Sequence, residues 1–195
     1  MAKADLSAQK RERNKAIRWV VSIFFVTIII SGTISFLSDA VMSGSSMFGA
    51  FLILLSIILV GILFDIIGMA VATADEKPFH SMAARKVAGA QEAISLLRNA
   101  ERVSSICNDV VGDICGVVSG SASATIAAQI LTNFEFSWPQ VISLTMSALA
   151  AGLTVGGKAI GKSFAVNSCT VIVHTVGRVI HSLNRLTGST RKKKK

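Results

Sequence analysis

Residues 47–72 read MFGAFLILLSIILVGILFDIIGMAVA, an apolar run interrupted only by Asp65. A run of this length is enough for an α-helix to cross the hydrocarbon core of a bilayer. The rest of the chain has the same character, because 51% of its 195 residues are hydrophobic and its mean hydropathy is +0.60. Such a composition is typical of a membrane protein. We therefore expect lipid to be the solvent for most of the chain.

Three further apolar segments predict three more membrane-crossing helices. The first of them carries no charge and extends about 28 Å at 1.5 Å per residue, which matches the hydrocarbon thickness. The third crossing is rich in Gly, Ala and Ser, and the fourth begins with Trp138, a residue type enriched at membrane interfaces. The four crossings are predicted at residues 19–37, 47–72, 103–131 and 138–157, within a transmembrane domain that covers residues 19–162.

Polar segments around these helices predict the other parts of the chain. After the second crossing, apolar residues recur at helical spacing between Pro78 and Leu97, which predicts two short helices at the inner membrane surface. The segment after the fourth crossing has one polar face and predicts an amphipathic juxtamembrane helix, with a fifth crossing as the alternative. The predicted parts are a basic cytoplasmic arm at 1–18, a cytoplasmic connector at 73–102, the amphipathic helix at 163–185 and a basic disordered tail at 186–195.

The positions of the basic residues predict the orientation. If the turns at 38–46 and 132–137 are outside, all twenty Lys and Arg residues lie on the cytoplasmic side or at its membrane boundary. We therefore interpret the net charge of +9 as a topology signal and as an attraction to anionic headgroups, not as a nucleic-acid surface. The sequence predicts an all-α integral protein of the plasma membrane with both termini in the cytoplasm.

Three carboxylates are predicted at one depth inside the bilayer. Asp65 lies about two turns before the cytoplasmic end of its helix, and Asp109 and Asp113 lie at a matching depth in the third crossing. Each ionisable residue costs about 2.5 to 3.5 kcal/mol at the centre of a membrane helix, so a functional role is the default hypothesis. Asp109 and Asp113 share a helix face with Ser105, and Asn108 lies beside that face. Oxygen ligands of this kind suit Mg²⁺ or Ca²⁺, and we predict a divalent cation site at these five residues.

Two other interpretations of the carboxylates stay open. In one, the acids are protonated and hydrogen-bonded to hydroxyl groups, or they pair with Lys158 as a structural ion pair. In the other, they relay protons or a monovalent cation. We do not expect an enzyme, because the sequence shows no nucleophile with a base, no paired acids beside a water-accessible pocket and no phosphate loop.

A stripe of small residues runs along the third crossing at every fourth position, beginning with Gly112, Gly116 and Gly120. Such stripes let helix backbones approach closely in lipid, so we predict a helix-packing surface. The sequence leaves open whether the surface packs within the chain or between two copies. Because it offers more packing surface than four helices need, we expect a homodimer.

Several short motifs follow one another between Phe64 and Ile114. In order, they are Gly68-Met69-Ala70, Lys86-Val87-Ala88-Gly89-Ala90-Gln91-Glu92-Ala93, Leu97-Arg98-Asn99, Ser104-Ser105 and Asn108-Asp109-Val110-Val111-Gly112-Asp113-Ile114. This segment resembles the transmembrane domain of the CNNM/CorB-CorC family of magnesium transport proteins. With the following helices, the likeness covers about residues 47–185.

The resemblance implies a dimer that holds a dehydrated Mg²⁺ between its helices. It places Asp109 and Asp113 at or beside Asn positions of the family, and Asp65 near a Ser-containing motif. Where the family has Gly-Glu-x-x-Pro-Lys, this chain has Lys158 in place of the Glu. The expected function is transport of a divalent cation, Mg²⁺, with exchange for Na⁺ as one form of coupling. The alternatives are a non-transporting scaffold or subunit that assembles with a membrane partner, and a proton or monovalent cation transporter. We expect no organic cofactor and no regulatory nucleotide-binding domain in this chain.

Overall fold

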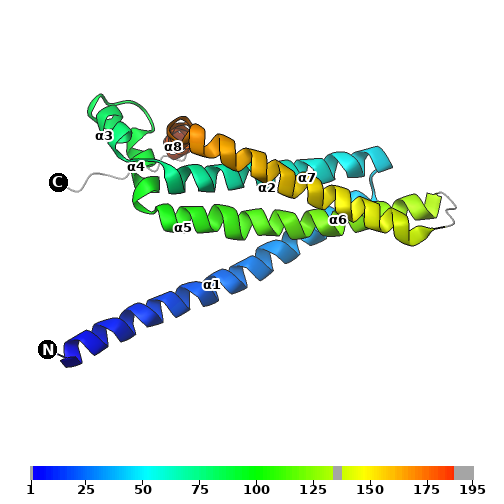
Figure 1. The fold of residues 1–195 in the computed structure, drawn as a ribbon, viewed down its shortest axis with the longest axis horizontal. Coiled ribbons are helices and arrows are strands. Elements are labelled where there is room, and N and C mark those ends of the chain that lie inside the picture. The colour runs from blue at the N-terminus through cyan, green and yellow to red at the C-terminus, as the bar shows by residue number, and fades with distance from the viewer. Residues whose placement is uncertain (1, 134–137, 187–195) are drawn as a thin grey trace.

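The structure, a computed structural model, describes residues 2–133 and 138–186, and all regular elements in these ranges are helices (Figure 1). Four stretches are long and apolar enough to cross a membrane, and they confirm the predicted all-α chain with four spanning helices. Residues 187–195 of the predicted tail and residues 134–137 of the predicted turn at 132–137 lie outside the described residues. The four stretches are Ile17–Met42, Met47–Thr73, Ala100–Asn133 and Pro139–Asn167.

Each stretch belongs to one continuous or nearly continuous helical segment. The third is built from two α-helices with a π-helix, η1, between them. The elements are α1 (Ala2–Ser43), α2 (Met47–Thr73), α3 (Lys77–Ala84), α4 (Ala90–Arg98), α5 (Ala100–Ser105), η1 (Ile106–Gly112), α6 (Asp113–Asn133), α7 (Pro139–Asn167) and α8 (Cys169–Leu186).

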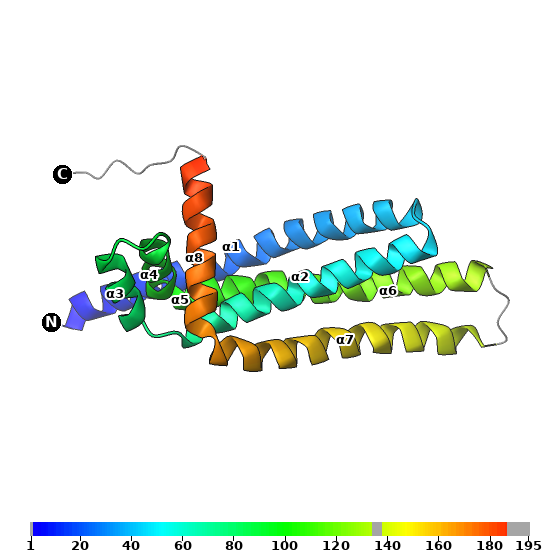
Figure 2. The ribbon, with the colours of Figure 1, turned by 90° about the horizontal axis from the view of Figure 1, so that it is seen from above.

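The core of the molecule is a bundle of α2, α6 and α7, and α1 leans against it from outside (Figure 2). The amide of Gln129 in α6 donates a hydrogen bond to the carbonyl oxygen of Met42 at the end of α1, at 3.2 Å. Towards its N-terminus α1 diverges from the bundle (Figure 1). Large apolar side chains on α1 therefore stay uncovered, among them Ile29 and Phe36, which are 66% and 74% exposed. Such a surface indicates contact with lipid or with another protein.

Two short helices, α3 and α4, form the segment between the second and third spans, as predicted. They lie with α8 at one end of the bundle, and α8 runs across that end instead of along the spanning helices (Figure 2). Gly89 and Gly177 let α4 and α8 approach closely, since a Cβ atom on Gly89 would lie 2.5 Å from the backbone nitrogen of Arg178. A hydrogen bond between Nδ1 of His181 in α8 and Oε1 of Glu92 in α4, 2.9 Å apart, also joins these two helices. Among the described residues, α8 is not one of the stretches long and apolar enough to cross a membrane, and the amphipathic juxtamembrane helix stays a prediction.

Two helix boundaries differ from the predicted ones because nothing in the sequence breaks the helix there. The predicted basic arm and first crossing form one helix, α1, since residues 10–20 contain neither Gly nor Pro and are rich in helix-forming Arg and Lys. The first turn is correspondingly shorter, with Ser46 as the N-cap of α2, where its side chain accepts from the backbone N–H of Gly49.

The change from the fourth crossing to the amphipathic helix also lies later than predicted. The helix α7 continues to Asn167, and the amphipathic helix begins at Cys169 rather than at Ser163. Gly161 and Ala165 are buried on the inner face of α7, so this last part of the helix still packs on the bundle. The hydrophobic pattern changes at residue 163, but the backbone turns only at Ser168.

Candidate functional site

Lys158 of α7 lies between two of the three predicted carboxylates. Its Nζ atom is 3.9 Å from Oδ1 of Asp65 in α2 and 3.9 Å from Oδ1 of Asp113 in α6. It also donates a hydrogen bond of 3.3 Å to the carbonyl oxygen of Gly112. The three helices of the bundle therefore meet at one charged cluster, formed by Asp65, Asp113 and Lys158.

Burial differs strongly among these three side chains. Asp65 is 5% exposed and Lys158 is 19% exposed, whereas Asp113 is 75% exposed at the edge of the cluster. The second oxygen of Asp65, Oδ2, is buried and accepts no hydrogen bond from any described residue. A buried polar atom without a partner costs about 1–3 kcal/mol, so this oxygen is available to a ligand.

A second unpartnered oxygen lies on the helix facing Asp65. The Oδ1 atom of Asn108 in η1 is buried and accepts no hydrogen bond from the described residues, although its amide donates to Ser104 at 3.3 Å. Asn108 fits here because Gly68 of α2 has no side chain, and a Cβ atom on Gly68 would lie 2.7 Å from its Cγ. Gly68 is less than one helical turn from Asp65. The facing surfaces of α2 and η1 thus carry two buried oxygens without donors.

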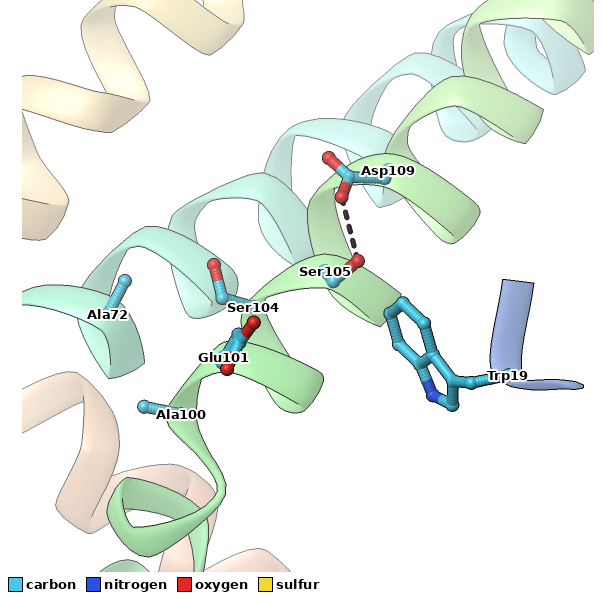
Figure 3. Close-up of a pocket in the computed structure, with 7 residues that line it drawn as sticks. All are labelled: Trp19, Ala72, Ala100, Glu101, Ser104, Ser105 and Asp109. Carbon is cyan, nitrogen blue, oxygen red and sulfur yellow. Dashed lines mark hydrogen bonds between the residues drawn. The ribbon is translucent and has the colours of Figure 1, made fainter. Parts of the chain in front are cut away.

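The π-helix η1 separates the carboxylates that an α-helix would align. A π-turn holds more residues than an α-turn. The side chains after it are therefore rotated about the helix axis, compared with their positions in an unbroken α-helix. Asp109 accepts a hydrogen bond of 2.8 Å from the hydroxyl of Ser105 and lines a pocket towards α1 (Figure 3). The structure therefore brings Asp65 and Asp113 to Lys158 and places Asp109 and Ser105 elsewhere. Nothing in the spacing of the residues reveals the π-turn.

The closest helix contacts use glycines that the sequence analysis did not select. A Cβ atom on Gly61 would lie 2.8 Å from that of Cys115, and one on Gly161 would lie 2.8 Å from Cγ1 of Ile66. The absence of a side chain on Gly157 similarly makes room for the side chain of Ile62. The four-residue spacing of Gly157 and Gly161 is the signal that could have found this surface of α7.

Of the predicted packing stripe, only its first member has a close neighbour within the chain. A Cβ atom on Gly112 would lie 3.3 Å from Nζ of Lys158, whereas a Cβ atom on Gly116 or Gly120 would meet no atom of another element within 4 Å. A side chain at either of these two glycines would thus enter open space.

The charged cluster offers several oxygen ligands but also a competing cation. Two carboxylates and one ammonium group leave one negative charge, and the Asn108 amide and the Gly112 carbonyl add neutral oxygens. Within residues 2–133 and 138–186, no three His, Cys, Asp or Glu side chains are grouped closely enough to hold a metal ion. Binding of a cation here stays a prediction. Such a cation must take the place of Lys158.

Comparison of the chain with protein-family models, with curated proteins and with solved structures found no match. The resemblance to the CNNM/CorB-CorC family therefore stays a prediction from the motifs, and the interpretation of the site depends on its geometry.

Proposed function

We propose that this chain binds a cation between α2, η1, α6 and α7 and moves it across the membrane, with Mg²⁺ as the ion. The observation that carries the proposal is the buried carboxylate of Asp65, whose Oδ2 atom has no partner and whose Oδ1 atom faces Lys158. Ionisable side chains at membrane depth are costly and are found where ions or protons pass. The CNNM/CorB-like motifs of the sequence support Mg²⁺ as the ion.

In this proposal Lys158 occupies the site when no ion is bound. Its distance of 3.9 Å from each carboxylate is too long for a hydrogen bond, so attraction between charges and the hydrogen bond to Gly112 hold it there. A divalent cation would neutralise Asp65 and Asp113 together, with Asn108 as a further oxygen ligand, and Lys158 would move away. The return of Lys158 after release would prevent two bare carboxylates from facing each other.

Flux of Mg²⁺ into liposomes tests this proposal. Liposomes that contain the purified protein and an enclosed Mg²⁺ indicator should report uptake with the wild type and little with the double variant Asp65→Asn/Asp113→Asn. The matched control is Asp39→Asn, which removes a carboxylate at the opposite end of the bundle and should leave the flux unchanged. Equal flux in the wild type and the double variant would overturn the site.

A non-transporting scaffold or subunit is the second candidate function, and the position of Lys158 favours it. An ammonium group beside Asp65 and Asp113 is also what a purely structural ion pair needs. The same liposomes separate the candidates when they also carry Na⁺ and pH indicators. Movement of H⁺ or Na⁺ without Mg²⁺ identifies a proton or monovalent cation transporter, and the absence of all three fluxes identifies the scaffold.

We further propose that the end of the bundle with α3, α4 and α8 faces the cytoplasm at the plasma membrane. The basic residues support this side, because Arg98 and Arg178 lie in α4 and α8 and Arg85 follows directly after α3. An impermeant thiol reagent applied to intact cells should label Ser43→Cys and Glu135→Cys but not Ser95→Cys. Labelling of Ser95→Cys from outside would reverse the topology.

A homodimer is part of the proposal. The open surface at Gly116 and Gly120 supports it, because these glycines would let the backbone of a second copy approach closely.

A further inference from the structure

A second site of different chemistry lies where α1 diverges from the bundle (Figure 3). The pocket has a volume of about 490 Å³. Trp19 lines it from α1 and Ala72 from α2, and the remaining lining residues come from α5 and η1: Ala100, Glu101, Ser104, Ser105 and Asp109. It is separate from the cluster around Lys158, because none of the residues of that cluster lines it.

The pocket lies at the boundary of the membrane. Trp19 and Ala100 stand at or near the first residue of their spans, and Ala72 stands near the last residue of its span. Asp109 is eight residues beyond Glu101, which corresponds to about 12 Å along the helix axis. The pocket therefore extends from the level of the lipid headgroups into the adjacent part of the hydrocarbon core.

Its two carboxylates have no basic partner. Among the residues that the structure describes, no Lys, Arg or His side chain is within 4.0 Å of the carboxylate of Glu101 or of Asp109, and none lines the pocket. The hydroxyl of Ser105 donates to one oxygen of Asp109, which leaves the other as an acceptor. The pocket thus presents two carboxylates without a counter-charge, which favours a positively charged ligand.

Trp19 determines what kind of cation fits. Its indole ring points into the space beside Ser105 and Asp109, and 38% of the residue is exposed (Figure 3). An aromatic face attracts an ammonium group strongly and provides no ligand for a metal ion. Mg²⁺ requires about six oxygen ligands in a near-octahedral arrangement, whereas an ammonium group requires only acceptors and an apolar wall.

We propose that this pocket binds an organic ammonium group, with Trp19 against the group, Asp109 accepting its N–H groups and Glu101 adding negative charge at the other end of the pocket. Two sources can supply this group at membrane level. One is the headgroup of phosphatidylethanolamine, which enters sideways between α1 and α5. The other is a free primary amine such as ethanolamine, which enters from the aqueous side.

The lipids that stay bound during purification show whether a lipid supplies the ammonium group. The protein is purified from membranes of equal phosphatidylethanolamine and phosphatidylglycerol content, and retained lipids are counted by native mass spectrometry. The wild type should retain mostly phosphatidylethanolamine, and the double variant Glu101→Gln/Asp109→Asn should lower its ratio to phosphatidylglycerol about tenfold. Asp39→Asn should keep the wild-type ratio. Trp19→Phe should keep part of the preference and Trp19→Leu should lose more of it, because both are smaller but only Phe has an aromatic face.

The free-amine source is tested by fluorescence. Trp138→Phe leaves Trp19 as the single tryptophan, since the chain contains two. In phosphatidylglycerol nanodiscs, ethanolamine should change its emission in a saturable way if the pocket binds free amines. Selective lipid retention without this response assigns the site to the lipid, and a response without retention assigns it to the free amine. The proposal would be overturned by the absence of both effects, by effects of equal size in the double carboxylate variant, or by an equal fluorescence response to Mg²⁺ alone.

Discussion

The apolar stretches Ile17–Met42 of α1 and Met47–Thr73 of α2 have similar lengths, 26 and 27 residues, but very different surroundings. None of the most apolar stretch of α1 is buried inside the chain, whereas 28% of that of α2 is. The glycines show the reason. Gly61 and Gly68 of α2 receive Cys115 and Asn108 from the third span, but Gly32 of α1 has no neighbouring atom within 4 Å. A span thus becomes part of the core where small residues let another backbone approach, and its hydrophobicity alone does not decide this.

The largest effect on the free energy of unfolding should come from the buried charge of Asp65, because only α2 carries such a charge in the core. Lys158→Met leaves Asp65 buried without its counter-charge, and we expect a loss of about 3 kcal/mol in the free energy of unfolding. Thermal unfolding in mild detergent measures it. Adding Asp65→Asn should recover most of the loss, because the charge that lacked a partner is then gone.

The same variant connects stability with the proposed ion. If Mg²⁺ takes the place of Lys158, millimolar Mg²⁺ should raise the melting temperature of Lys158→Met more than that of the wild type. An equal shift in both proteins would argue for a purely structural ion pair.

A smaller effect is expected from a single methyl group at the contact of α2 with η1. Gly68→Ala places a Cβ atom against the side chain of Asn108, and such overpacking costs about 2 kcal/mol. Gly32→Ala is the matched control in α1, where the methyl group meets open space and the change should stay within about 0.5 kcal/mol. Equal losses at both positions would mean that α1 is packed as closely as α2.

The open glycines of α6 should affect assembly and leave the single chain intact. Gly116→Leu should convert a dimer to a monomer in size-exclusion chromatography with light scattering, while the unfolding free energy of the monomer stays within about 0.5 kcal/mol. Gly32→Leu provides the control for an added bulky side chain outside the stripe. A wild type that is monomeric in both detergent and nanodiscs would remove the dimer from the proposal.

The smallest effect is expected on the uncovered surface of α1. Ile29 is 66% exposed, so Ile29→Ala should change the unfolding free energy in nanodiscs by less than about 0.5 kcal/mol. A loss of about 2 kcal/mol or more would show that another protein chain covers this surface of α1.

The sequence by itself determined the class of the protein, its four spanning helices and the short connector helices. Hydrophobic length and the spacing of apolar residues are local properties, and lipid imposes them on every span because a spanning backbone must satisfy its own hydrogen bonds. The sequence also identified Asp65, Asp109 and Asp113 as unusual, since a charge inside an apolar run is visible without any structure.

The tertiary structure decided which of these residues face one another. The π-turn of η1 directs Asp113 towards Lys158 and Asp109 towards Trp19, and an assumed α-helical spacing could not separate them. It also selected Gly61, Gly68, Gly157 and Gly161 as the contact glycines and left Gly116 and Gly120 open. Contacts between helices depend on rotation and crossing, which are set by packing between distant segments, and for this reason the sequence pattern of one helix could not determine them.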